Sequence, residues 1–326
     1  MKTPFNVLRH VNQWEMAPRD PVTIGAAIIS ALGGSAALAA TTIAFNVTVA
    51  GVVGYLATTA ITSWAINALA PDVGGIGGSR GLMVNATDPA APHDIVYGAV
   101  RKGGIRTYVE ATGTENKFLH MILVLAGHEL EAIDDIYLND EIATVDASGF
   151  VTSGDWNSKV RIKKHLGDQI VVDSLLEQES NQITANFVGN GIAYLYIRLE
   201  YDQDAFANGV PLITAKVRGR KVYDPRSVST AYTANAALVV RDYITAGFGL
   251  ADSAVDDLAF AASANVSDEA IALDGGGTEP RYEINGVVSS DMSPRTIVSR
   301  MMSSCGGTLF WGQGKFQLHV GYYSNP

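Results

Sequence analysis

IAYLYIRLEY, residues 192–201, is the clearest β-strand in the sequence. Aliphatic and aromatic side chains dominate it, which is the composition that strands favour. Its neighbour in the sheet is expected to be ITAKVRGRKV, residues 213–222. The period-two pattern that marks these strands begins near Asp94. The folded part of the chain is therefore predicted to be mainly β.

Further strands are expected on the N-terminal side of this segment. They are residues 95–100, 105–111, 118–125, 132–139, 142–145 and 160–165, and a helix is expected at 173–179. The first two strands are predicted to form a hairpin across the turn at residues 101–104. About eight strands in roughly 130 residues are typical of a closed barrel or a sandwich.

The pattern changes after residues 223–226, where helices are added. Helices are expected at 235–244 with Asn235 as cap, at 252–264 with Asp252 or Ser253 as cap, and from Pro294 to 304. A strand at 281–289 and a hairpin of 308–311 with 315–320 complete the pattern. Because such a hairpin leaves an unpaired edge, we expect that the natural chain continues or that a partner strand covers it.

An uncharged stretch occupies residues 21–71, with no Asp, Glu, Lys, Arg or His. A spanning helix needs about 20 apolar residues, so two passes would fit. The stretch is rich in Ala, Gly, Thr and Val, and small residues let helix backbones approach closely. It is not typical of a signal peptide, whose apolar region is about 7–15 residues long. A transmembrane hairpin is one interpretation. A helical segment shielded by protein in one assembly and later released into lipid fits the composition better.

These observations divide the chain into five parts. They are an arm at 1–20, the apolar segment at 21–71, a Gly/Pro-rich hinge at 72–93, a β-barrel-like domain at 94–225 and an α/β domain at 226–326. The larger side chains of the apolar segment are expected to form its contacts: Ile24, Ile28, Ile29, Leu32, Leu38, Ile43, Phe45, Val52, Val53, Leu56, Ile61, Trp64, Ile66 and Leu69. The hinge depends on Gly74, Gly75, Gly77, Gly78 and Gly81.

Composition and motifs argue against catalysis and against nucleic-acid binding. The net charge of the chain is −10, whereas nucleic-acid binders carry a basic face. His128-Glu129 lacks the second histidine of a zinc protease, and the acidic turn from Asp202 lacks a closing glutamate for calcium. Cys305 is the sole cysteine and is expected to be a small core residue. We therefore predict no enzyme, no cofactor and no metal site.

A series of segments resembles one protein family. The segments are IVYGAVRKGG (95–104), GHELEAIDDIYLNDE (127–141), IAYLYIRLEYD (192–202), KVRGRKVYDPR (216–226), NAALVVRDYI (235–244), GFGL (247–250) and the helix and hairpin of residues 294–320. Their order and spacing, across residues 80–320, are similar to the tail tip (central hub) proteins of long-tailed bacteriophages, the family of the lambda-type host-specificity protein J. Relatives usually continue into fibronectin-like and receptor-binding parts, which this chain lacks.

The resemblance implies a fold, an assembly and a set of partners. The fold would be tail-tube-like β-barrel hub domains with helical additions, assembled as a homotrimer at the distal tip of a virion's tail. The partners would be the distal tail protein, other tail tip proteins and the tape-measure protein. Residues 21–71 would plug the lumen and enter the host membrane when DNA is ejected.

Two readings from other classes stay open. One is an integral membrane protein with a soluble β-rich domain, which predicts that the protein made alone fractionates with membranes. The other is a tail-associated enzyme such as a peptidoglycan hydrolase, which the missing catalytic constellation disfavours.

A charge placed in the uncharged stretch tests its burial. Ala39→Asp is expected to cost several kcal/mol whether the segment contacts lipid or packed protein. Particles carrying the substitution should assemble or infect poorly, as measured by titre and by tail morphology. Normal assembly and infectivity would contradict the plug.

Overall fold

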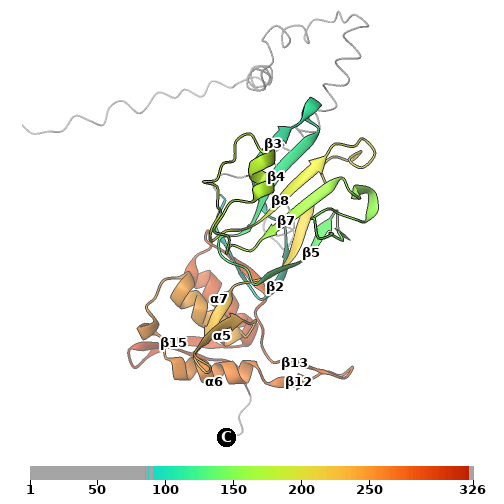
Figure 1. Ribbon diagram of the computed structural model, residues 1–326. Helices are drawn as coiled ribbons and strands as arrows, with labels where there is room; N and C mark the ends of the chain where they lie inside the picture. The colour runs from blue at the N-terminus through green and yellow to red at the C-terminus, as the bar shows by residue number, and fades with distance from the viewer. Residues whose placement is uncertain (1–84, 86, 88–90, 323–326) are drawn as a thin grey trace, which may run out of the picture. The chain divides into compact units, whose positions relative to one another are not determined.

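The structure is a computed structural model that describes residues 85, 87 and 91–322 (Figure 1). All of them belong to one unit of the chain, Ile61–Pro326. The expected arm, the apolar segment and the hinge glycines lie outside the described residues. The five-part division of the chain therefore stays a prediction.

The first sheet is built around β8 (Ala193–Glu200) and β4 (Phe118–Ala126). Its antiparallel order is β3-β4-β8-β7, with β3 at Ile105–Thr112 and β7 at Val160–His165. Side chains along β8 alternate between the two faces, as a strand requires. Leu195 and Ile197 of one face are in the main core, whereas Tyr194 and Tyr196 of the other belong to a separate cluster. Both faces of the strand are thus buried.

The second sheet has the order β2-β9-β5-β6. Its strands are β2 (Ala99–Lys102), β9 (Ile213–Arg218), β5 (Ala132–Leu138) and β6 (Glu141–Ile142). A bulge in β5 separates Ile133 from Ile136 and holds Asp134 and Asp135. Because a bulge inserts an extra residue, both isoleucines reach the core although they are three positions apart.

The two sheets pack face to face around one aliphatic core, which includes Leu123, Leu195, Val217 and Ile213. Within the described residues no β-ladder joins the sheets, so they form a sandwich. The expected closed barrel is therefore wrong. The chain passes from β2 to β3 at Gly103 and Gly104, where the ladder stops. A Cβ on Gly104 would lie 2.6 Å from the carbonyl oxygen of Val124, so only glycine fits this corner.

The expected hairpin of residues 95–111 is also wrong. Gly98, with φ of +62°, divides the segment into β1 (Asp94–Tyr97) and β2. β1 pairs with β14 (Gly286–Ser289), β2 pairs with β9, and β3 pairs with β4. Likewise β9 pairs with β5 and β2, so the expected pairing of 213–222 with 192–201 does not occur. Local period predicted these strands but not their long-range partners.

The remaining elements build a second core. Its helices are α5 (Ala236–Asp242), which continues as a π-helical turn over Tyr243–Gly247, α6 (Asp257–Ser267) and α7 (Pro294–Cys305). Three hairpins accompany them: β10 (Lys221–Asp224) with β11 (Ser229–Tyr232), β12 (Ala270–Ala272) with β13 (Thr278–Pro280), and β15 (Thr308–Gly312) with β16 (Lys315–His319). Short 3-10 turns lie at Thr114–Asn116, Gly154–Trp156 and Asp252–Ala254.

Local capping signals hold for most helices. Asn235 caps α5, as predicted, and Ser293 caps α7, which starts at Pro294 as predicted. Asp173 caps α4 (Ser174–Glu179). The second predicted cap is wrong, because Asp256 rather than Asp252 or Ser253 accepts from the first backbone amides of α6. Of the strand expected at 281–289, only β14 forms.

β1 connects the two cores. Val96 packs in the sandwich, and the next residue, Tyr97, packs against α5. The Tyr97 hydroxyl donates to Asp242 at 2.7 Å, and Arg220 lies 3.2 Å from the same carboxylate. Burial raises the pKa of Asp242, an effect that Arg220 and Tyr97 only partly offset. Polar contacts thus fix the sandwich to the helical part.

Two leucines, one buried and one exposed, give a test of the assigned core. Leu195→Ala empties a site with no exposed surface, and we expect a loss of about 2–5 kcal/mol in unfolding free energy. Leu258→Ala is the matched control, since that side chain is 84% exposed and should change stability by less than about 0.5 kcal/mol. Denaturant unfolding measures both, and equal losses would contradict the assigned core.

Candidate assembly surfaces

A strap covers the outer face of the first sheet. We use this name for residues 166–192, which include α4. Leu176 of α4 is fully buried against Ile122, Tyr194 and Tyr196 of the sheet. The sandwich therefore carries a third, partial layer, and the polar side chains beneath it must find partners within the protein.

Glu179 is the main anchor of the strap. Its carboxylate accepts two hydrogen bonds from Arg161, one of them at 2.9 Å, and one from the Tyr196 hydroxyl at 2.9 Å. Arg198 lies 3.4 Å from the same group. Burial by itself would raise the pKa of Glu179, but the bonds from Arg161 and Tyr196 outweigh it and hold the pKa below its usual range. The strap is thus fixed by an ionised carboxylate.

Hydrogen bonds extend from Glu179 into the sheet. Because Tyr196 donates to Glu179, its oxygen accepts from Nδ1 of His120 at 2.9 Å. Nε2 of His120 is then free to accept from the Thr112 hydroxyl at 2.7 Å. Burial lowers the pKa of His120, which favours this neutral ring. This hydrogen-bonded row crosses three strands and fixes the strap to the sheet. We call it the lock: Glu179, Tyr196, His120 and Thr112.

Asp173 fixes the other end of α4. One carboxylate oxygen accepts from the amides of Leu175 and Leu176 at 2.9 Å, and the other lies 3.0 Å from Nε2 of His165. The His165 ring stacks on Tyr194 with 4.4 Å between ring centres. Burial opposes ionisation, yet these bonds lower the pKa of Asp173. Both ends of the helix therefore depend on carboxylates.

The sheets end in strands that differ in how they are covered. The outer edge of β7 is capped by residues 149–151, since Ile162 donates to Gly149 and Val151 donates to Val160, both at 2.8 Å. β16 is covered by α6, where Asp256 donates to Phe316 and Ser263 to Leu318. Within the described residues, β3 and β15 have no second ladder partner. They are open edges of the kind that pair with other chains.

The open edge of β15 is also apolar. Phe310 is 44% exposed, Trp311 59% and the nearby Tyr322 48%, and we call these three residues the aromatic edge. Phe310 and Tyr322 border a groove of about 250 Å³ with Ala259, Ala262 and Val266 of α6. β15 itself carries no charged residue that would discourage pairing. Trp311, the next residue of the strand, faces the other side and packs edge-on against Phe316. Exposed apolar side chains beside a groove are typical of contact sites.

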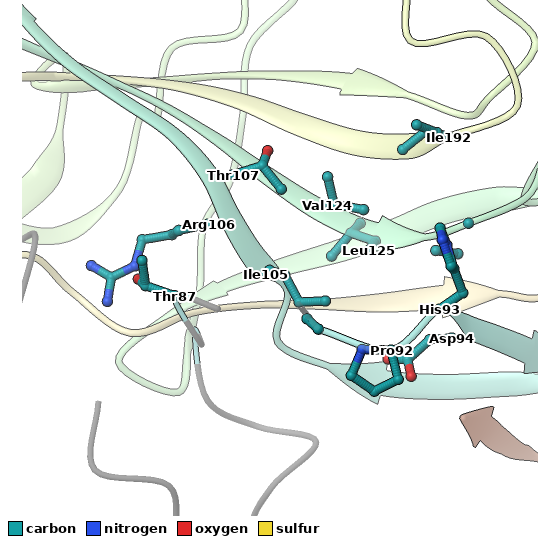
Figure 2. Close-up of a pocket in the computed structure, with 13 residues that line it drawn as sticks. Thr87, Pro92, His93, Asp94, Ile105, Arg106, Thr107, Val124, Leu125 and Ile192 are labelled. Atoms are coloured by element: carbon teal, nitrogen blue, oxygen red, sulfur yellow. The ribbon is translucent and has the colours of Figure 1, made fainter. Parts of the chain in front are cut away.

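A larger cavity, of about 500 Å³, lies at the end of the sandwich (Figure 2). Figure 2 shows it between Ile105 and Thr107 of β3, the end of β4, and the start of β1, where His93 precedes the strand and Asp94 is its first residue. The charge of Asp94 is neutralised by Lys102, a buried lysine that also donates to the Leu125 carbonyl. Asp94 is thus engaged in holding β1 to β2, and Arg106, which also lines the cavity, donates to the carbonyl of Asn85 at 3.3 Å.

The motifs noted in the sequence have structural roles. Nε2 of His128 accepts from the backbone amide of Val96 at 2.9 Å, and Nδ1 bonds the carbonyl of Glu129 at 2.7 Å. Burial lowers the pKa of His128 to about 4, so the ring is neutral and ties down β1. In the described part of the chain, no three side chains are arranged to hold a metal.

The acidic turn and the cysteine are likewise accounted for. Asp202 accepts from the amides of Asp204 and Ala205 at 3.1 Å and pairs with Lys159 at 2.9 Å. Cys305 is fully buried in the second core, which confirms the expected core role.

The predicted contact residues between Ile24 and Leu69 and the hinge glycines lie outside the described residues, so the structure brings none of them to a site. In the part that is described, helices are too short or too polar to span a bilayer. The strap anchors were not found from the sequence. Arginine and tyrosine at the outward positions of the clearest strand were the available signal, since such side chains need partners when covered.

Comparisons with known proteins give one likeness. No protein-family model matches the chain, and no curated protein matches it. Among solved structures, the chain is similar to a chain of a structure described as "Virion of native gene transfer agent (GTA) particle", with 16% identity and a TM-score of 0.44. The similarity covers 74% of this chain and 55% of that one, so this chain spans about half the length of its match. A likeness of this degree assigns neither fold nor function.

The anchors of the strap make its stability depend on pH. A carboxyl with a lowered pKa in the folded state stabilises the fold above its unfolded pKa, about 4.3 for glutamate, and this contribution disappears as the pH falls through the folded value. We therefore expect the amides of α4 to lose protection from exchange, relative to their intrinsic rates at each pH, below about pH 4.5. Glu179→Gln should lower the free energy of unfolding by about 2 kcal/mol at pH 7. It should also reduce the fall in stability at low pH, which we call the acid limb.

Glu177→Gln is the matched control, because Glu177 is exposed on the same helix. It should leave both stability and the acid limb unchanged, as followed by thermal unfolding between pH 3 and pH 8. An unchanged acid limb in Glu179→Gln would contradict the lock.

Proposed function

We propose that the chain is a structural protein of a phage-type virion, in which three copies form the central hub that closes the distal end of a tail. In this role it has no catalytic task. The hub contacts the distal tail protein above it, other tip proteins around it and the tape-measure protein inside it. It takes part in host attachment and in genome ejection.

One structural observation carries the proposal. β15 is an open, uncharged strand edge that exposes Phe310 and Trp311. A protein that functions alone usually protects such an edge with charges, proline or a covering element. β7 and β16 of this same chain are covered, whereas β15 and β3 have no second ladder partner among the described residues. A subunit whose edge is completed by another chain has this property.

The series of segments that resembles the tail tip family supplies the second argument. It runs from residue 95 to residue 320 and so spans both cores. Elements of both cores lie within or overlap these segments, among them β1, β5, β8, β9, α5 and α7. Closed rings remove strand edges by pairing each with a neighbour, which is the use we propose for β3 and β15.

The uncharged residues 21–71 have a defined task in this proposal. Three copies would pack in the lumen as an apolar plug or hold the end of the tape measure, with Gly74–Gly81 as the hinge that releases them. Charge-free helices rich in small residues accept both protein and lipid neighbours, so the same segment suits insertion into the host membrane. The net charge of −10 suits a lumen through which DNA slides without adhering.

Assembly through the aromatic edge is testable on the full chain. Phe310→Glu combined with Trp311→Glu should abolish incorporation into particles while leaving the melting temperature within about 2 °C, since both side chains are exposed. Phe248→Glu is the control, because Phe248 is an exposed aromatic residue on another element. Mass spectrometry of purified particles and cryo-electron microscopy of the tail tip read the outcome.

Threefold density at the tip, lost only in the double variant, would support the hub. Absence of the wild-type chain from particles, together with its recovery in membranes, would favour the membrane-protein reading and contradict the proposal.

A further inference from the structure

The hairpin of β12 and β13 projects as an arm. It follows α6 and extends from the helical part (Figure 1). We define the acidic arm as residues 268–280. Only Ile271 in it is even half-buried, and the residues of the tip Leu-Asp-Gly-Gly-Gly, 273–277, are all exposed. Its ladder has three residue pairs. A two-stranded hairpin of this size is marginally stable by itself in water, so a surface that receives it is needed to hold it in place.

The charges of the arm are unbalanced at its tip. Asp268 pairs with Arg226 and Glu269 pairs with Arg281, both near the base. Asp274 and Glu279, farther out, form no ion pair with any described residue. The outer part of the arm therefore combines two carboxylates without an ion pair, Asp274 and Glu279, with three glycines, which allow close approach of another backbone.

α7 presents a face of complementary character. Ile297, Met301 and Cys305 point into the second core. On the opposite side Thr296, Ser299 and Ser303 are exposed, and Arg295 and Arg300 flank them. We call these five residues the α7 face. Its middle is small and hydroxyl-bearing and its borders are cationic, so a narrow glycine-rich acidic tip fits it.

The α7 face carries two arginines, and the described part of the chain holds nine others, of which Arg106 donates to the carbonyl of Asn85 at 3.3 Å. Eight arginines there form ion pairs with carboxylates: Arg101, Arg161, Arg198, Arg218, Arg220, Arg226, Arg241 and Arg281. Arg295 and Arg300 form none with a described residue, and Arg300 donates a hydrogen bond to the sulfur of Met292 at 3.3 Å. In a chain of net charge −10, these two cations are left for an external carboxylate.

We infer that the acidic arm of one copy docks on the α7 face of a neighbouring copy. In Figure 1 the arm extends from the end of α6 away from α7, so the two surfaces do not meet within one chain. A contact between two different surfaces is heterologous, and repetition of it generates a closed ring when the rotation between copies allows closure. The inference rests on the proposed function in its premise that several copies assemble, and it identifies the surfaces.

Cross-linking places the two surfaces against each other. Gly275→Cys and Ser299→Cys are made in separately tagged full chains, purified in mild detergent, mixed and oxidised. Gly275 has open space at its Cβ and no left-handed φ, so cysteine fits there, and the native Cys305 is buried. We expect a disulfide between the two tags. Ser227→Cys, on the exposed turn of another hairpin, is the control partner for Ser299→Cys and should form at least tenfold less.

Charge reversal tests the energetics. Asp274→Lys with Glu279→Lys should weaken association of the copies roughly tenfold in analytical ultracentrifugation, and the addition of Arg295→Glu with Arg300→Glu should restore it to within about threefold. Asp155→Lys with Glu177→Lys is the control, since it changes net charge equally at exposed positions elsewhere. Restoration by the combined variant separates a pairing of surfaces from misfolding.

The outcomes distinguish this inference from the proposed function. Oligomers that form normally, ignore the reversals and show no cross-link above the control would overturn the arm contact and leave the hub intact. A chain that stays monomeric at all concentrations and is absent from particles would overturn both. The selective disulfide with reciprocal restoration would establish the contact.

Discussion

The structure depends on the burial of β8 on both faces. One face is aliphatic and packs against the second sheet, which needs no further explanation. The other face carries Tyr196 and Arg198, whose polar groups cannot be left without partners beneath a covering layer. Glu179 on the strap contacts both side chains and Arg161 of the neighbouring strand. Within the described residues, the Nε atoms of the two arginines are left without a hydrogen bond. The strap is therefore a consequence of the polar outer face of the strand, and the fold is a sandwich with a third, charged layer.

This covering determines where the molecule has surface left for partners. With the outer face of the first sheet covered by the strap and β7 capped, strand edges and projecting hairpins are the surfaces that we propose for contact with other chains. The aromatic edge of β15 and the acidic arm differ in chemistry, since one offers backbone groups and aromatic rings and the other offers carboxylates. Apolar contact supplies affinity, whereas charge supplies orientation and selectivity. An assembling subunit needs both, and the chain carries them on separate hairpins of one core.

Sequence patterns predicted what is local and missed what is distant. β7 was predicted with its observed limits, Val160–His165, because alternation is recorded within six residues. The caps Asn235 and Ser293 were predictable for the same reason. The strand order was not, because Gly98 and the corner at Gly104 redirect the chain through contacts with Asn285 and Val124, far away in sequence. The lock around Glu179 combines three strands with the strap, so no short window contains it. The expected closed barrel was wrong for the same reason, because closure depends on long-range pairing between strands.

The treatment of charge separates the inside of this protein from its outside. Within the fold, cations are matched closely: Lys102 to Asp94, Arg161 to Glu179, Arg220 to Asp242. Burial makes each unmatched charge costly, so these pairs follow from the fold itself. On the surface no such constraint exists, and water satisfies a lone arginine at little cost. Arg295, Arg300, Asp274 and Glu279 are therefore not needed for folding. Opposite charges that folding leaves unused, on two surfaces that do not meet in one chain, can be brought together only by a second copy.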